Sequence, residues 1–236
     1  MAKTGNRALD ERKVDAVTTD RAATVVTTAN GTQRWEWQDD LGSGSFGKVF
    51  SEKCVAGPAN LIGTLRAVKV LDKPTTATAQ ADLGRELSTL FLASRDGAPD
   101  RFTRAHGWWE SPTDVYIAMD CFEDGDLYDN IRRPLPEKDA ATIIRQLLEA
   151  AQYLHSKNIT HRDIKPRNLM VKSRPTSKAL STPWDVKLGD FGLAERHKNT
   201  KAFGFLNGRG TPDYLGPEIT GDGCEESESG YLTPPP

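Results

Sequence analysis

The decisive stretch of this chain is His161-Arg162-Asp163-Ile164-Lys165-Pro166-Arg167-Asn168, with Asp190-Phe191-Gly192 following it. The carboxylate of Asp163 can take a proton from a hydroxyl group, and the ammonium group of Lys165 can neutralise charge on a transferring phosphate. Asn168 and Asp190 add hard oxygen ligands of the kind that Mg²⁺ prefers. Together these residue types predict a phosphoryl-transfer site that uses magnesium.

The composition is that of an ordinary folded chain. Its 236 residues, 37% hydrophobic and 27% charged, are enough for one large domain or two small lobes. The formal net charge is -2 and the basic residues are spread along the chain. We therefore expect neither nucleic acid nor an anionic membrane as a partner.

Cysteine usage and the N-terminal residues indicate a compartment. The three cysteines, Cys54, Cys121 and Cys224, lie far apart with no C-x-x-C pair, so neither a disulfide framework nor a zinc site is expected. Residues 1–15 lack the apolar segment of a signal peptide, and no run approaches the roughly 18 apolar residues of a membrane span. The expected location is cytoplasmic or nuclear.

Patterns along the first half predict a small antiparallel sheet and one helix. Residues 1–33 show little apolar periodicity and are expected to be a disordered N-terminal arm, although 14–26 could form a transient helix or strand. A helix is expected within 78–94, where apolar residues recur on one face. Five strands are expected, at 35–41, 47–54, 65–71, 106–110 and 115–120.

The second half of the chain is predicted to contain a long helix and one pair of strands. Pro136 precedes a long helical pattern at 137–156, a position where proline suits a helix start. Strand patterns at 169–172 and 185–188 flank an insertion rich in Ser, Pro and Thr. Residues 221–236 are acidic and end in prolines, which predicts a disordered tail. The fold class is therefore α+β.

A glycine-rich string opens the sheet region. Gly42-Ser43-Gly44-Ser45-Phe46-Gly47 has the form G-x-G-x-x-G, in which backbone without Cβ can approach phosphate groups. A dinucleotide-binding fingerprint would need a helix directly afterwards, whereas 48–54 reads as a strand. A P-loop would need Ser or Thr where Val49 stands. Both of these alternatives fail on local context.

Taken together, the segments resemble the eukaryotic protein kinase family of the Ser/Thr type. The resemblance covers about residues 35–220. It implies a bilobal fold, with a five-stranded antiparallel N-lobe sheet, one long helix and the hinge in 34–122, and an incomplete helical C-lobe in 123–220. A full kinase continues with more helices after Glu218, so the resemblance also implies a C-terminally truncated catalytic domain. The helix at 137–156 would then leave apolar surface exposed.

The resemblance implies ATP as the phosphoryl donor and Mg²⁺ as the cofactor. Lys69, in Ala67-Val68-Lys69, would hold the α- and β-phosphates, with Glu86 as its helix partner and Asp82 as the runner-up. Asp163 and Lys165 would act on the transferring group, and Asn168 and Asp190 would hold the metal. The implied ATP-binding residues are Leu41, Gly42, Ser43, Gly44, Ser45, Phe46, Gly47, Val49, Ala67, Lys69, Asp120, Phe122, Asp126 and Met170, of which Asp120 and Phe122 would bind adenine through their backbone and Asp126 the ribose.

The same resemblance bears on substrates and regulation. Lys165 and Thr211, which would bond to Asp163, are typical of Ser/Thr kinases, so protein substrates are the expected partners. Arg167 stands where many kinases have Glu and disfavours basic peptides. Thr200 is the only hydroxyl side chain between Phe191 and Thr211. An upstream activating kinase could phosphorylate it, and Arg162 would capture that phosphate.

Two alternatives stay open from the sequence. The chain could be a truncated nucleotide-binding or scaffolding pseudoenzyme without turnover, because an intact set of site residues says nothing about a missing part of the fold. It could also be a small-molecule or atypical kinase that shares the core, which Thr211 and Lys165 disfavour. His161 is expected to be a packed residue and not a catalytic base.

Overall fold

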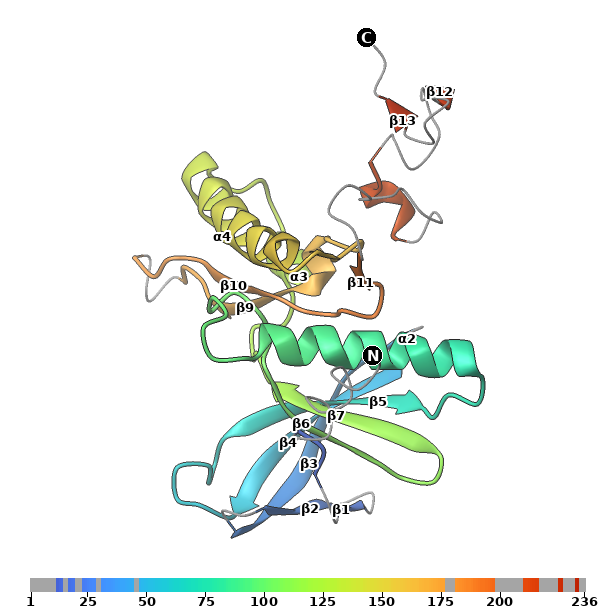
Figure 1. The fold of residues 1–236 in the computed structure, drawn as a ribbon. Coiled ribbons are helices and arrows are strands. Elements are labelled where there is room, and N and C mark those ends of the chain that lie inside the picture. Colours follow the sequence, from blue (N-terminus) through green and yellow to red (C-terminus); the bar gives the residue numbers. More distant parts are fainter. Residues whose placement is uncertain are drawn as a thin grey trace. The chain divides into compact units, whose positions relative to one another are not determined.

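The computed structural model describes residues 12–14, 17–19, 23–28, 31–44, 47–176, 181–197, 210–216, 225–226 and 232–233 (Figure 1). The chain forms two compact units. The first contains Met1–Asp96 and Thr103–Phe122, and the second contains Gly97–Phe102 and Glu123–Pro236. Within the described residues, no helix is long and apolar enough to cross a membrane.

A seven-stranded antiparallel sheet forms the body of the first unit, and Figure 1 shows it curled, with helix α2 along one side. The strand order is β1-β2-β3-β4-β5-β7-β6, with neighbouring strands antiparallel throughout. The strands are β1 (Val17–Thr19), β2 (Ala23–Thr28), β3 (Gly31–Gly44), β4 (Gly47–Ala56), β5 (Leu65–Asp72), β6 (Ala105–Glu110) and β7 (Asp114–Asp120).

The two N-terminal strands correct two predictions, a disordered arm over 1–33 and a five-stranded sheet. Strand β2 pairs with β3 along its whole length. Residues 24–28 are all Thr or Val, and such β-branched side chains favour extended backbone. Val26 is buried in a cluster with Trp35 and Cys54. The prediction gave weight to the polar composition of this segment and too little to its β-branching.

Helix α2 (Ala77–Ala93) lies where a helix was predicted. It begins after Thr76, whose hydroxyl accepts a hydrogen bond from the Ala79 amide at 3.2 Å, which satisfies one of the unpaired amides of the first turn. Ser94 ends the helix by donating its amide to the Leu90 carbonyl. The buried face is formed by Leu87, Thr89, Leu90, Phe91 and Ala93.

The second unit is built from short elements around one long helix, α4 (Glu137–Ser156). Helix α3 (Leu127–Asn130) precedes it, and two 3-10 turns, η1 (Pro166–Asn168) and η2 (Pro212–Tyr214), follow. The paired strands are β8 (Ile159–Thr160) with β11 (Glu195–Arg196), β9 (Leu169–Ser173) with β10 (Asp185–Leu188), and β12 (Glu225–Glu226) with β13 (Leu232–Thr233). The predicted helix and the predicted strand pair are therefore present.

The pair β12–β13 lies where a disordered tail over 221–236 was predicted. Glu225 pairs with Thr233 and Glu226 with Leu232. A ladder this short needs only backbone donors and acceptors, so an acidic composition does not prevent it.

Helix α4 holds strand β10 through one buried amide. The Gln146 side chain donates to the Trp184 carbonyl at 2.7 Å and accepts from the Val186 amide at 2.9 Å. On another face of α4, Ile144 and Leu148 are 51% and 63% exposed. The helix thus shows part of its apolar stripe to solvent, as the sequence had led us to expect.

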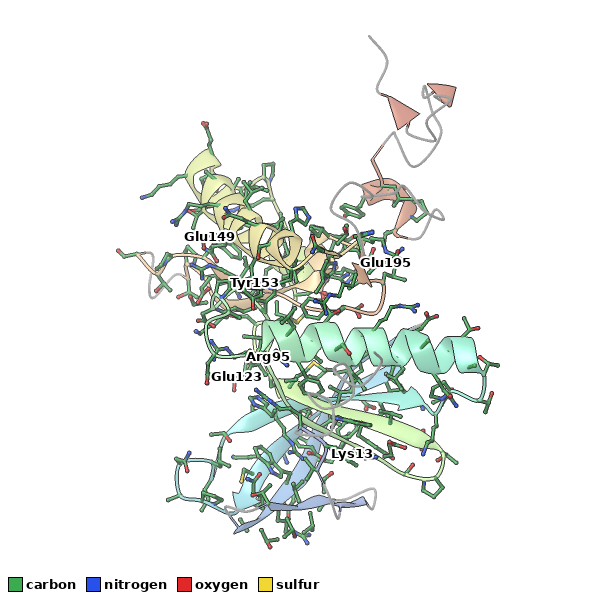
Figure 2. All side chains as sticks on the ribbon, in the orientation of Figure 1. Lys13, Arg95, Glu123, Glu149, Tyr153 and Glu195 are labelled. Carbon is green, nitrogen blue, oxygen red and sulfur yellow. The ribbon has the colours of Figure 1, made fainter. Side chains whose placement is uncertain are left out.

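The segment Gly97–Phe102 belongs to the second unit, although the sequence had placed it in a domain over 34–122. The Phe102 ring lies 5.7 Å from Tyr153 and 6.1 Å from Phe191, measured between ring centroids. Arg101 forms an ion pair with Glu149 at 2.7 Å; Tyr153 and Glu149 both lie on α4 (Figure 2). Aromatic packing and this ion pair attach the segment to the helix.

Candidate active site

The three glycines of the string lie at the end of β3 and the start of β4 in the first unit. Gly42 pairs with Val49 and Gly44 with Gly47, while Ser45 and Phe46 lie outside the described residues. Gly47 has φ +99°, and a Cβ there would lie 2.1 Å from the Val70 carbonyl oxygen. Only glycine fits such a position. Leu41, Gly42 and Ser43 are exposed, so this end of β3 presents the accessible backbone that a phosphate-binding loop needs.

Lys69 on β5 forms an ion pair with Glu86 on α2. Its ammonium nitrogen lies 2.7 Å from Glu86 Oε1, and the two side chains are only 9% and 12% exposed. A lysine this buried is expected to be paired with an acid. Asp82, the second candidate for the partner of Lys69, forms an ion pair with Arg85 instead. The geometry therefore favours Glu86 as the group that orients Lys69.

The other residues assigned to ATP in the first unit lie on β4, β5 and the end of β7. Val49 is half-buried and Ala67 is buried, while Phe122, just beyond β7, is half-buried. Asp120 donates its amide to the Arg104 carbonyl at 2.9 Å, so a hydrogen bond to adenine at this residue would use its carbonyl oxygen. Its carboxylate lies 3.0 Å from His106 Nε2. Of the Asp120 backbone, only the carbonyl oxygen could thus take the predicted role of binding adenine.

Asp163 in the second unit is held by hydrogen bonds to both carboxylate oxygens. Oδ1 accepts from the Thr211 amide at 3.1 Å and from its hydroxyl at 2.7 Å. Oδ2 accepts from Asn168 Nδ2 at 2.9 Å and lies 2.8 Å from Lys165 Nζ. Burial raises the pKa of this carboxyl, but the hydrogen bonds from Lys165, Thr211 and Asn168 together outweigh burial and lower it. The group is therefore ionised and able to accept a proton.

Asn168 and Asp190 come close through the backbone, because the Gly189 amide donates to the Asn168 carbonyl at 2.9 Å. Asn168 Nδ2 donates to both the carbonyl and the carboxylate of Asp163, which leaves its side-chain oxygen as the atom that could bind a cation. Asp190 has φ +56°, a left-handed conformation that Asp tolerates.

This donor set fits Mg²⁺, which commonly takes one or two protein oxygens and completes its shell with phosphate and water. Among the described residues there is no group of three or more His, Cys, Asp or Glu that could hold a metal by themselves. Asn168 and Asp190 could hold such an ion if phosphate and water complete its shell.

His161 is a buried packing residue. Its Nε2 lies 3.0 Å from the Gly189 carbonyl oxygen, and its ring lies 5.3 Å from Phe191. Because a carbonyl can only accept, Nε2 carries the proton, and Nδ1 faces the Asp163 amide at 3.4 Å. Burial lowers the pKa of the imidazole, so His161 is neutral and positions the loop beside it.

Arg162 pairs with a carboxylate that no sequence motif indicates. Its Nε donates to the Leu193 carbonyl at 2.7 Å, and its Nη1 forms an ion pair with Glu195 (labelled in Figure 2). No local sequence pattern identifies Glu195 as this partner, because the contact depends on the pairing of β11 with β8. Thr200, the predicted source of a phosphate for Arg162, lies outside the described residues, and its regulatory role stays a prediction.

Asp126, predicted to bind ribose, has two other partners. It caps α3 by accepting from the Asp129 amide at 2.9 Å, and its other oxygen lies 3.4 Å from Arg167 Nη1. The Arg167 guanidinium lies 3.9 Å from the centroid of the Tyr128 ring. Arg167 thus pairs with two acids at α3, Asp126 and Asp129. Met170, the last predicted ATP contact, is half-buried on β9.

Comparison with known proteins identifies the family of the chain. The family model described as "Protein kinase domain" matches residues 35–232. The chain belongs to the protein kinase family. Its α+β kinase-like fold is that implied by the sequence, with seven strands in place of five.

Relatives of this chain include animal and plant proteins named as kinases. It is 29% identical over 199 residues to calcium/calmodulin-dependent protein kinase type 1 of Caenorhabditis briggsae, covering 83% of this chain and 51% of that protein. It is 31% identical over 191 residues to CBL-interacting protein kinase 21 of Oryza sativa subsp. japonica, covering 79% and 33%. With CBL-interacting serine/threonine-protein kinase 20 of Arabidopsis thaliana the identity is 31% over 185 residues, covering 77% and 38%. The chain spans from a third to about half the length of these curated relatives.

A pair of variants on α2 tests the role of the Lys69–Glu86 ion pair. Glu86→Gln removes the negative charge that holds Lys69, and we expect kcat/KM for ATP to fall roughly 10- to 100-fold because the ammonium group loses its orientation. Asp82→Asn, one turn earlier on the same helix, should change it by less than about twofold, since its partner Arg85 is on the exposed face. Steady-state kinetics with varied ATP measures both, and equal losses in the two variants would contradict the assignment.

Proposed function

We propose that this chain transfers the γ-phosphoryl group of ATP to Ser and Thr hydroxyls of protein substrates. The observation that carries the proposal is the hydrogen-bonded set of Asp163, Lys165 and Thr211. A buried carboxylate kept ionised, 2.8 Å from an ammonium group, is suited to proton transfer beside developing negative charge. The match to the protein kinase family supports the same reaction.

Each group has a defined part in the proposed step. A substrate hydroxyl oxygen forms a bond to the γ-phosphorus, the bond from that phosphorus to the β,γ-bridging oxygen breaks, and ADP leaves. Asp163 accepts the hydroxyl proton, and Lys165 neutralises the transferring oxygens. Mg²⁺, when bound, supplies positive charge to the phosphates, and Asn168 and Asp190 would hold it.

The first unit would hold the nucleotide. The exposed backbone of Gly42 and Ser43 would lie against the phosphates, and Lys69 would bind the α- and β-phosphates while Glu86 keeps it in place. Val49 and Ala67 would contribute apolar surface to the adenine ring. A positioned lysine and backbone donors suit this task because phosphoryl transfer depends mainly on positioning and charge stabilisation.

Thr211 supports hydroxyl acceptors of the Ser/Thr type. Its hydroxyl accepts from Lys165 at 2.6 Å and donates to Asp163 at 2.7 Å, so it fixes both side chains. The relative from Arabidopsis thaliana is named a serine/threonine-protein kinase.

Three peptides that differ only in the acceptor residue test the proposal. With Ser, Thr or Tyr at one position of the same sequence, we expect transfer from labelled ATP to Ser and Thr to exceed transfer to Tyr at least about tenfold, because Tyr places its oxygen much farther from the backbone. Scintillation counting of the captured peptides gives the ratio. Preferred labelling of Tyr, or labelling of none of the three while a small alcohol is phosphorylated, would contradict a protein Ser/Thr kinase.

A further inference from the structure

Residues 12–14 run along strand β6, the last strand in the order of the seven-stranded sheet. The Val14 amide donates to the Trp108 carbonyl at 2.9 Å, and the Trp108 amide donates to the Arg12 carbonyl at 3.2 Å. The pairing of Lys13 with Trp108 is parallel, whereas the seven strands pair antiparallel. An edge strand offers unpaired backbone groups, and a segment from the N-terminus occupies them here.

Arg12 connects this segment to the end of helix α2. Its Nη1 donates to the Ala105 carbonyl at 3.1 Å and its Nη2 to the Ser94 carbonyl at 3.5 Å, while its guanidinium lies 5.8 Å from the centroid of the Phe91 ring. Ser94 itself donates its hydroxyl to the Leu90 carbonyl at 2.7 Å and accepts from the Ala105 amide at 2.8 Å. One cation thus ties the last turn of α2 to the first residue of β6.

Lys13 adds an ion pair at the outer side of β6, where Figure 2 labels it. Its ammonium nitrogen lies 2.8 Å from Glu110 Oε1 and 4.9 Å from the centroid of a Trp108 ring. Lys73, which follows β5, binds the other Glu110 oxygen at 2.5 Å. Hydrogen bonds from Lys13 and Lys73 lower the pKa of the Glu110 carboxyl. Both lysines thus stabilise the charged form of Glu110.

Val14 completes the contact by packing inward. It lies against the buried cluster of Val26, Trp35 and Cys54. The space for it depends on Gly107, because a Cβ at that residue would lie only 2.9 Å from Val14 Cγ2 and 3.4 Å from the Arg12 carbonyl oxygen. The sheet edge is therefore shaped to receive this segment.

We propose that residues 12–14 form a strap that holds α2 in the position where Glu86 meets Lys69, with Arg12 as a positioning residue. Ser94 follows Glu86 by about two turns of a continuous helix, and a helix moves nearly as a rigid rod, so fixing one end restricts the carboxylate. This inference deepens the proposed function and rests on it, because the Lys69–Glu86 pair matters to the reaction only if the chain uses ATP. A cation in the N-terminal segment then controls the site without touching it.

Arg12→Ala in the full chain tests the strap by two independent readouts. We expect hydrogen exchange of the amides in 87–94 to speed up about tenfold, while exchange in β9 and β10 of the second unit stays the same, since the lost contact is local to the first unit. We also expect kcat/KM for ATP to fall roughly tenfold with the KM for the peptide unchanged. Arg12→Lys keeps a cation at this position, so both the hydrogen exchange and kcat/KM for ATP should change less than in Arg12→Ala.

Arg34→Ala is the matched control, because Arg34 is an exposed arginine of the same unit that pairs only weakly with Glu36, at 3.4 Å. It should leave both readouts unchanged. Gly107→Ala would crowd the strap at Val14, so it should speed exchange in 87–94 as Arg12→Ala does. The double variant Arg12→Ala with Gly107→Ala should show little more than the larger of the two single effects, because both substitutions release the same strap.

The outcomes separate the strap from the proposed function. If the unaltered chain transfers no phosphate, the proposed function fails, and hydrogen exchange still decides whether the strap holds α2. Unchanged exchange in Arg12→Ala, the same change in Arg34→Ala, or fully additive effects in the double variant would overturn the strap.

Discussion

An Asp163→Asn variant should lose nearly all phosphoryl transfer, with kcat lower by about 10²- to 10⁴-fold, the range for loss of a general base. Asn has almost the same shape as Asp, so nucleotide binding by the first unit should stay as it is. The amide, however, cannot accept the hydroxyl proton, and its NH₂ group would face donors that now bind the carboxylate, namely Lys165 and Asn168. The loss should therefore be in kcat.

The matched control is Asp129→Asn in the same unit. Asp129 is 66% exposed and lies on α3, where its nearest cation is Arg167 at 3.7 Å. We expect kcat within about twofold of the unaltered chain, because an exposed ion pair of this length contributes little. Rates with saturating ATP and peptide, together with the thermal midpoint of each variant, separate loss of chemistry from loss of fold. Equal kcat values in the two variants would contradict the role of Asp163.

The second large effect concerns the stability of the first unit. Arg66 and Glu52 face each other across β5 and β4 and are nearly fully buried. Arg66 donates to Glu52 Oε2 from Nε at 2.8 Å and from Nη2 at 2.6 Å, and its guanidinium lies 4.1 Å from the centroid of a Trp35 ring. Burial lowers the pKa of Arg66, and the Glu52 charge opposes this.

Glu52→Ala should therefore lower the free energy of unfolding of this unit by roughly 3–5 kcal/mol, because it leaves a buried cation without its partner. The double variant Glu52→Leu with Arg66→Met should recover most of the loss, since well-packed apolar side chains can replace a buried ion pair. Glu36→Ala, which breaks the exposed pair with Arg34, should cost less than about 1 kcal/mol. Urea unfolding followed by tryptophan fluorescence measures all three. A double variant as unstable as Glu52→Ala would show that the loss comes from packing and not from charge.

Most of the candidate site could be predicted because its signals are local. The strand of Lys69, the helix of Glu86 and the loop from His161 to Asn168 each follow from spacing within a short window, and the structure places them in those elements. The resemblance to a family also implied the contact between Asp163 and Thr211, which are 48 residues apart. Here the resemblance to a family supplied what periodicity could not.

The contacts that the sequence did not reveal depend on residues that meet only after folding. Arg12 reaches Ala105, 93 residues away, from a segment whose composition predicts disorder. Glu195 meets Arg162 because β11 returns to β8. Neither residue has a local pattern that sets it apart from an ordinary surface charge, so tertiary structure is needed to find the partner.

The measurement that tests the central claim most directly is transfer of labelled γ-phosphate from ATP to a generic protein substrate with Mg²⁺, in the unaltered chain and in Asp163→Asn side by side. We predict label on Ser and Thr of the substrate that depends on Mg²⁺ and is lost in Asp163→Asn. Equal label in the two proteins, or binding of ATP by the unaltered chain without any transfer, would contradict the account and favour a nucleotide-binding module without turnover.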